Sequence, residues 1–106
     1  MVVSMNRILT EKLPQVVALC QSTGVRKLEA FGSVVRDDFN EETSDLDFLV
    51  ELQDAPVIDY GRAYFNLKEG LEGLFGRSVD LLTIKSLVNP YLRKRVFEEK
   101  RAVYAA

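Results

Sequence analysis

Two short apolar runs, each joined to a small polar motif, constrain most strongly what this chain can fold into. The first, residues 28–31, leads into the pair Gly32-Ser33, and the second, residues 46–50, carries Asp45 before it and Asp47 within it. Because successive side chains of a β-strand point to opposite faces, the two acids share one face, with Cα atoms about 6.5 to 7 Å apart. The apolar side chains that alternate with them, at positions 46, 48 and 50, point the other way, toward a core. The sequence therefore predicts two strands that present a turn and a pair of carboxylates.

The turn and the carboxylates are complementary in charge. At a strand-to-helix turn, Gly32 lets backbone amides come close to a bound anion, and a short helix beginning at Ser33 points its positive end at that anion. Mg²⁺ prefers carboxylate oxygens and bridges them to phosphate. We therefore expect Asp45 and Asp47 to hold a metal ion and Gly32-Ser33 to hold the phosphates of a nucleotide. The alternative is a solvated strand end after an acidic loop over residues 38–44.

Arg36 has two interpretations. It falls within one helical turn of the expected phosphates, where its guanidinium could neutralise phosphate charge. Alternatively, it forms a surface ion pair with Asp37, Asp38 or Glu41. The residues alone leave both interpretations open.

The composition excludes several kinds of site. The chain contains no histidine and a single cysteine, Cys20, which is expected to pack in the core. Ser-His-Asp and Cys-His catalysis, intrachain disulfides and cysteine-based zinc sites are therefore excluded. A net charge of −2 provides no basic field for a nucleic-acid backbone, so no direct nucleic-acid binding is expected.

The length and hydropathy indicate a globular protein. A chain of 106 residues with 47% hydrophobic residues favours one domain over residues 1–106. No run approaches the ~20 apolar residues of a membrane span, and the first residues do not begin a secretory signal. We therefore expect a cytoplasmic protein without a membrane anchor.

Hydrophobic periodicity predicts an α/β (α+β) order of elements. The expected helices cover residues 10–22, 59–76 and a segment from residue 89, and the expected strands cover 25–31, 45–52, 77–83 and a short edge segment near 103–104. Thr10 is the predicted N-cap of the first helix, and Gly24 closes it. Gly70 and Gly73 each cost about 1 kcal/mol relative to alanine inside the second helix, so they mark close packing or a frayed last turn.

The last helix is predicted to begin at Asn89-Pro90, an N-cap residue followed by proline at the first helical position. Leu92, Val96 and Phe97 are expected to face inward. The basic run over residues 93–95 could hold a triphosphate or dock an acidic partner, or it forms a solvated helix face.

Asp80 is the only acid in the strand expected over residues 77–83. If this strand lies beside the one over residues 45–52, Asp80 can project onto the face of Asp45 and Asp47 and complete a cluster of three carboxylates. The spacing alone does not establish that the strands are adjacent. The alternative is a surface acid next to Arg77.

Together these motifs resemble the signature of the DNA polymerase beta-like nucleotidyltransferase superfamily, in which a glycine-serine pair precedes an Asp-x-Asp or Asp-x-Glu pair. FGSVVR at residues 31–36 and SDLDFLV at residues 44–50 are most similar to its minimal nucleotidyltransferase (MNT) branch, the antitoxin partners of HEPN toxins. The resemblance runs over nearly the whole chain. It implies a small mixed β-sheet flanked by helices, and it places Asp80 beside the other two acids.

The resemblance also implies a reaction. Asp45, Asp47 and Asp80 would hold Mg²⁺, in two ions, while Gly32, Ser33 and Arg36 hold the phosphates of ATP. AMP would pass to a tyrosine of a cognate HEPN toxin ribonuclease and neutralise it, as in a type VII-like toxin-antitoxin pair, so the chain is expected to be a protein adenylyltransferase in a hetero-oligomer with its toxin. Two alternatives remain: a non-catalytic antitoxin that acts by steric binding, and a small-molecule nucleotidyltransferase.

This chain departs from the family pattern in one loop. Residues 34–44 make eleven positions where ten are usual, and Asp37 stands where a glycine commonly follows the arginine. One more residue in a surface loop costs little closure entropy, so the metal site should be unaffected. The position of Arg36 over the phosphates is the feature that the longer loop would alter.

Overall fold

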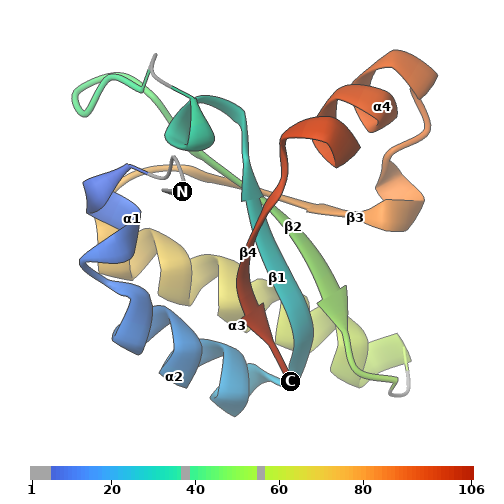
Figure 1. The fold of residues 1–106 in the computed structure, drawn as a ribbon. Helices are drawn as coiled ribbons and strands as arrows, with labels where there is room; N and C mark the ends of the chain where they lie inside the picture. Colours follow the sequence, from blue (N-terminus) through green and yellow to red (C-terminus); the bar gives the residue numbers. More distant parts are fainter. Residues whose placement is uncertain (1–5, 37–38, 55–56) are drawn as a thin grey trace.

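The protein is built around a four-stranded mixed sheet (Figure 1). The computed structural model describes residues 6–36, 39–54 and 57–106, with residues 57 and 58 described by their backbone alone. The strands are β1 (Val25–Phe31), β2 (Leu46–Leu52), β3 (Val79–Thr83) and β4 (Arg101–Ala105), in the spatial order β3-β2-β1-β4. β1 is antiparallel to β2 and to β4, whereas β2 and β3 are parallel. The expected mixed sheet and α/β class are confirmed.

The helices are α1 (Arg7–Thr10), α2 (Leu13–Thr23), α3 (Val57–Phe75) and α4 (Pro90–Glu99), with two short 3₁₀ helices, η1 (Gly32–Val35) and η2 (Ile84–Ser86). Most predicted boundaries agree with these bounds within two residues. β3 begins at Val79 rather than at residue 77, and the Arg77 guanidinium before it donates to the carbonyls of Glu41 (2.7 Å) and Ser44 (3.1 Å).

The start of the first predicted helix is wrong. Thr10 does not cap α2 but ends α1, whose N-cap is Asn6, with Oδ1 accepting from the Ile8 amide at 2.8 Å. Pro14 explains the break between the two helices, because a proline ring clashes with the carbonyl four residues before it. Pro14 therefore lies in the first turn of a new helix, and Gly24 ends that helix with φ = +74° as predicted.

α2 and α3 cover one face of the sheet and α4 lies over the other (Figure 1). The first face holds the main core, in which Phe48 and Val50 of β2 are almost fully buried together with Leu67 of α3. α2 and α3 pack closely, since a Cβ on Gly70 would lie 2.6 Å from a methyl carbon of Leu19. The close-packing interpretation of Gly70 is thereby confirmed.

The second face holds a smaller cluster, which consists of Phe31, Leu49, Leu87 and Val96 with Leu82 against it. Asn89 caps α4 as predicted, accepting from the amides of residues 91 and 92. The inward orientation expected for Leu92 and Phe97 is wrong, because these side chains are 43% and 39% exposed. α4 thus leaves part of this face open.

Candidate functional site

The register of three strands brings Asp47 and Asp80 next to each other. Each is the second residue of its strand, and they are Cα partners in the parallel pair β2–β3. Asp47 also pairs with Phe31, the last residue of antiparallel β1. The end of β1 therefore delivers the following residue, Gly32, to the side of Asp47.

Gly32 is required at this turn for two reasons. Its φ of +77° is a conformation that residues with a side chain rarely adopt. In addition, a Cβ at this position would overlap Oδ2 of Asp47. The absence of a side chain therefore makes room for the Asp47 carboxylate.

The pKa of Asp47 is raised from 3.8 to about 7. Burial of the carboxyl is the largest cause, followed by the charge of Asp80 and a hydrogen bond with it, while Asp45 adds a smaller repulsion. Only the positive charge of Arg36 acts in the opposite direction. A half-buried carboxyl group, Asp47, and an exposed one, Asp80, that repel each other are arranged to receive a cation.

The other two residues predicted for the site lie further out. Asp45 is exposed and stands one residue before β2, and Ser33 is half-buried in η1, where its carbonyl accepts from the Arg36 amide at 3.1 Å. Neither is among the described residues that line the cavity. Within residues 6–36, 39–54 and 57–106, no group of three or more Asp, Glu, His or Cys side chains is placed to hold a metal ion. The structure thus brings together a pair of acids, with Asp45 near it.

Arg36 is paired with Glu99, the last residue of α4. One guanidinium nitrogen donates to both carboxylate oxygens of Glu99, at 2.9 and 2.8 Å, and the Gly32 amide donates to one of the same oxygens at 3.2 Å. Arg95 contacts the other oxygen at 3.5 Å. Of the partners proposed for Arg36, Asp37 and Asp38 lie outside the described residues.

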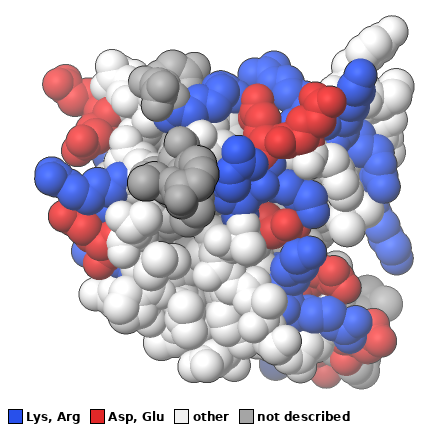
Figure 2. All heavy atoms as spheres, viewed as in Figure 1, with Lys and Arg blue, Asp and Glu red and all other residues white. Residues whose placement is uncertain are grey.

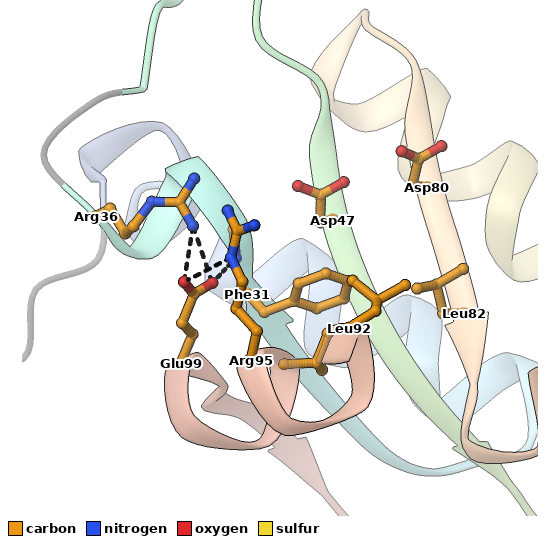
Figure 3. A pocket seen from close by; sticks show the side chains of 10 residues that line it. Phe31, Arg36, Asp47, Asp80, Leu82, Leu92, Arg95 and Glu99 are labelled. Atoms are coloured by element: carbon orange, nitrogen blue, oxygen red, sulfur yellow. Dashed lines mark hydrogen bonds and ion pairs between the residues drawn. The ribbon is translucent and has the colours of Figure 1, made fainter. Parts of the chain in front are cut away.

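These groups surround a cavity of about 460 Å³ between the sheet and α4 (Figure 3). Asp47 and Asp80 point into it from the strands, and Arg36, Arg95 and Glu99 lie across from them. Phe31, Leu82, Leu92 and Val96 form its apolar floor. A cavity of this size fits a nucleotide-sized ligand whose phosphates meet guanidinium groups and whose cation meets carboxylates.

Sequence reasoning missed Glu99, and it left open whether Arg95 was functional. Glu99 is 67 residues from Gly32 along the chain, so no local pattern connects them. One signal was present: an acid at the C-terminal end of a helix is unfavourable with the helix dipole and needs a compensating partner. The basic residues at 36 and 95 supply it.

The comparisons with known proteins agree with this geometry. The model of the nucleotidyltransferase domain family matches residues 15–103. Protein adenylyltransferase MntA of Thermococcus cleftensis is 38% identical over 76 residues, which are 72% of this chain and 72% of that protein. A structure described as “Structure of putative minimal nucleotidyltransferase” superposes with a TM-score of 0.67 and 36% identity, covering 88% of this chain and 90% of that one.

A third similarity concerns a complex. The fold resembles a structure of a tri-AMPylated Shewanella oneidensis HEPN toxin in complex with MNT antitoxin, with a TM-score of 0.61, 19% identity and coverage of 92% of this chain and 73% of that chain. At this identity the similarity concerns the fold alone. The described part of the chain also contains no helix long and apolar enough to cross a membrane.

Proposed function

Because this chain belongs to the nucleotidyltransferase domain family, we propose that it is an antitoxin that transfers AMP from ATP to a tyrosine of a cognate HEPN toxin. The toxin is neutralised by the modification. The reaction takes place in the cytoplasm, where ATP is available, and residues 1–106 act as one domain in complex with the toxin.

One observation carries the proposal: Asp47 and Asp80 lie side by side in a cavity that also contains the Gly32 amide and two guanidinium groups. This arrangement separates a cation-binding side from an anion-binding side. A Mg²⁺-nucleotide has the same two parts, because the cation is coordinated by the phosphates.

The acids present fit Mg²⁺. Asp47 and Asp80 would hold it through carboxylate oxygens, and the repulsion that raises the pKa of Asp47 would be relieved by a cation. In this proposal Asp45, whose charge acts on Asp47 from just before β2, supplies a further oxygen. When bound, Mg²⁺ would neutralise the charge that grows on the phosphates during transfer.

The chain's own residues orient the nucleotide. Arg36 would bind phosphate oxygens together with the amides of Gly32 and Ser33. The acceptor hydroxyl oxygen attacks the α-phosphorus, a new P–O bond forms, and the bond to the bridging oxygen of the β-phosphate breaks. Pyrophosphate leaves, and the hydroxyl proton passes to solvent.

A protein acceptor is supported by the relatives. MntA of Thermococcus cleftensis is named a protein adenylyltransferase, and the Shewanella oneidensis complex contains an AMPylated HEPN toxin. The cavity of about 460 Å³ has room for one nucleotide, so a small-molecule acceptor would need a pocket of its own. An acceptor residue presented by a folded partner needs no such pocket.

The test uses the protein with its cognate HEPN toxin, which is sought as the product of the adjacent gene, together with Mg²⁺ and ATP labelled at the α-phosphate. We expect a mass gain of ~329 Da per attached AMP on the partner. Asp47→Asn and Asp80→Asn should lower the rate by a factor of about 100 or more, because each removes a charge needed for cation binding. Asp54→Asn is the matched control, since Asp54 is exposed, lies outside the cavity and forms an ion pair with Arg26 at 3.9 Å.

The result separates the enzymatic mechanism from steric inhibition. If Asp47→Asn and Asp80→Asn fold, bind the toxin and still neutralise it, the chain inhibits by binding. If no nucleoside triphosphate supplied as donor leads to modification of a correctly folded partner, the adenylyltransferase proposal is wrong.

A further inference from the structure

Glu99 occupies the anion-binding side of the cavity. Its carboxylate accepts from the Gly32 amide at 3.2 Å and from Arg36 at 2.8 and 2.9 Å. Figure 3 shows it between Arg36 and Arg95, across the cavity from Asp47 and Asp80. An oxyanion held by a backbone amide and a guanidinium is bound by the same donors that bind a phosphate.

The position of Glu99 is costly without these partners. It is the last residue of α4, where the partial negative charge of the helix end repels a carboxylate. Its side chain is only 21% exposed, so it is also partly withdrawn from water. Its contacts with Gly32 and Arg36 hold it in place, which means that they are engaged when no ligand is present.

The contacts of Glu99 with Gly32 and Arg36 change the balance of charge in the cavity. Two guanidinium groups, on Arg36 and Arg95, face three carboxyl groups, on Asp47, Asp80 and Glu99. With Glu99 in place the lining has one more carboxyl group than guanidinium groups, whereas without it the two kinds of group are equal in number. Without it, the Gly32 amide and the Arg36 guanidinium would no longer donate to this carboxylate and could donate to phosphate oxygens instead.

We propose that Glu99 is an autoinhibitory internal anion, which holds the Gly32 amide and Arg36 until a triphosphate displaces it. This inference rests on the proposed function, because it names the competitor that the phosphates of ATP must displace at that site. It assigns Glu99 a role in setting nucleotide affinity rather than in the chemical step.

Arg95 gives the displaced carboxylate an alternative partner. It is one helical turn before Glu99 on α4, it lies 3.5 Å from Oε2, and its side chain is 64% exposed. A rotation of the Glu99 side chain toward Arg95 would release Gly32 and Arg36 without moving the backbone of α4. Binding of the triphosphate therefore requires a change of side-chain rotamer alone.

The test measures the affinity for inorganic tripolyphosphate and for ATP by calorimetry, with Mg²⁺, at pH 8 and fixed ionic strength. The variants are Glu99→Gln, which keeps the shape and an accepting oxygen, and Glu99→Asp, which keeps the charge but is one methylene shorter. Glu98→Gln is the matched control, because it makes the same charge change on an exposed neighbour.

Glu99→Gln should bind both ligands about five- to tenfold more tightly than the wild type, as expected when one like charge is removed from a partly buried site. Glu99→Asp should bind more tightly by a smaller factor, and Glu98→Gln should remain within about twofold. If Glu99→Gln does not fold, a wild-type affinity in Glu99→Asp would itself contradict the inference.

Two results would overturn the inference while leaving the proposed function standing. Equal ATP affinity in the wild type and both Glu99 variants would show that the carboxylate does not compete. Weaker binding in the Glu99 variants would show that Glu99 positions Arg36 for the phosphates. Absence of ATP binding in all proteins would instead contradict the proposed function and the inference with it.

Discussion

The two faces of the sheet use the same strands for different purposes. On the face covered by α2 and α3, the strand side chains enter a main core that consists of apolar residues. On the face under α4, the apolar cluster is small, and Asp47, Asp80 and Glu29 come from the same strands. Because side chains alternate along a strand, each strand serves both purposes at once.

Charged residues are also distributed unequally between the two faces of the sheet. α2 contains no charged residue, whereas α4 contains five, over residues 93–95 and 98–99. Figure 2 shows an uncharged area where α2 lies in Figure 1 and charged side chains gathered toward α4. On the α4 face two partly buried acids are paired with basic residues, Glu29 with Lys100 at 3.0 Å and Glu99 with Arg36 at 2.8 Å, whereas Asp47 lies beside another acid, Asp80. One face therefore stabilises the fold, and the other keeps charges in place around a cavity.

Deleting one leucine from each face should sharpen this difference most. Leu67 is fully buried in the main core and Leu87 lies in the smaller cluster. We expect Leu67→Ala to lower the free energy of unfolding by about 4 kcal/mol and Leu87→Ala by about 2 kcal/mol, because the open face can collapse into the space left behind. Urea denaturation measures both, and equal losses would contradict the division between the faces.

A substitution at the turn should affect activity more than stability. Gly32→Ala places a Cβ against Oδ2 of Asp47, whereas Gly24→Ala has the same left-handed strain, at φ = +74°, with no atom within 4 Å of the added carbon. Both should lower stability by about 1 to 2 kcal/mol. Only Gly32→Ala should lower the rate of AMP transfer, by about 100-fold, which corresponds to ~2.7 kcal/mol. Similar rates in the two variants would show that Gly32 is needed only for its backbone conformation.

The raised pKa of Asp47 makes stability depend on pH. The folded protein holds this proton up to a pH of about 7, whereas the unfolded chain releases it near 3.8. Stability is therefore lost progressively as the pH rises from about 4 through 7. In EDTA, Asp47→Asn should match the wild type near pH 4 and exceed its free energy of unfolding by roughly 1 to 2 kcal/mol at pH 8.5. A difference that does not change with pH would contradict this cause.

The smallest effect concerns two glycines of α3. Gly73→Ala adds a methyl group in open space and should stabilise the protein by about 0.5 to 1 kcal/mol through helix propensity. Gly70→Ala has the same gain, but its methyl group would force Leu19 to move, so its net change should be close to zero or destabilising. Thermal denaturation of the two variants measures both changes in stability. Equal gains in stability would contradict the close packing of α2 on α3.

The sequence predicted features that depend on near neighbours. β1 was placed at its observed bounds because an apolar run ends at a glycine, and the caps at Gly24 and Asn89 follow from their local chemistry. The break before α2 was missed because periodicity was weighed without the steric effect of Pro14 on the carbonyl of Thr10. Local rules located these elements, but helical spacing did not predict that Leu92 and Phe97 of α4 are exposed.

The site depends on contacts that local rules do not reach. The pairing of Asp47 with Asp80 needed the adjacency of β2 and β3, which the family resemblance implied and the register now shows. The Glu99 contact joins the last residue of a helix to a turn 67 residues earlier, and nothing in the spacing encodes it. The roles of Asp45, Asp47, Asp80, Gly32, Ser33 and Arg36 in catalysis stay predictions.

The most direct measurement is the thermal shift that Mg²⁺ and a non-hydrolysable ATP analogue produce together at pH 8. The wild type and the Asp54→Asn control should gain ~5 °C or more at saturation, because the ligand binds only the folded state. Asp80→Asn, which folds but lacks one of the two neighbouring carboxylates, should gain less than half of that. An undiminished shift in Asp80→Asn would contradict the claim that the acids of β2 and β3 together form the metal-nucleotide site.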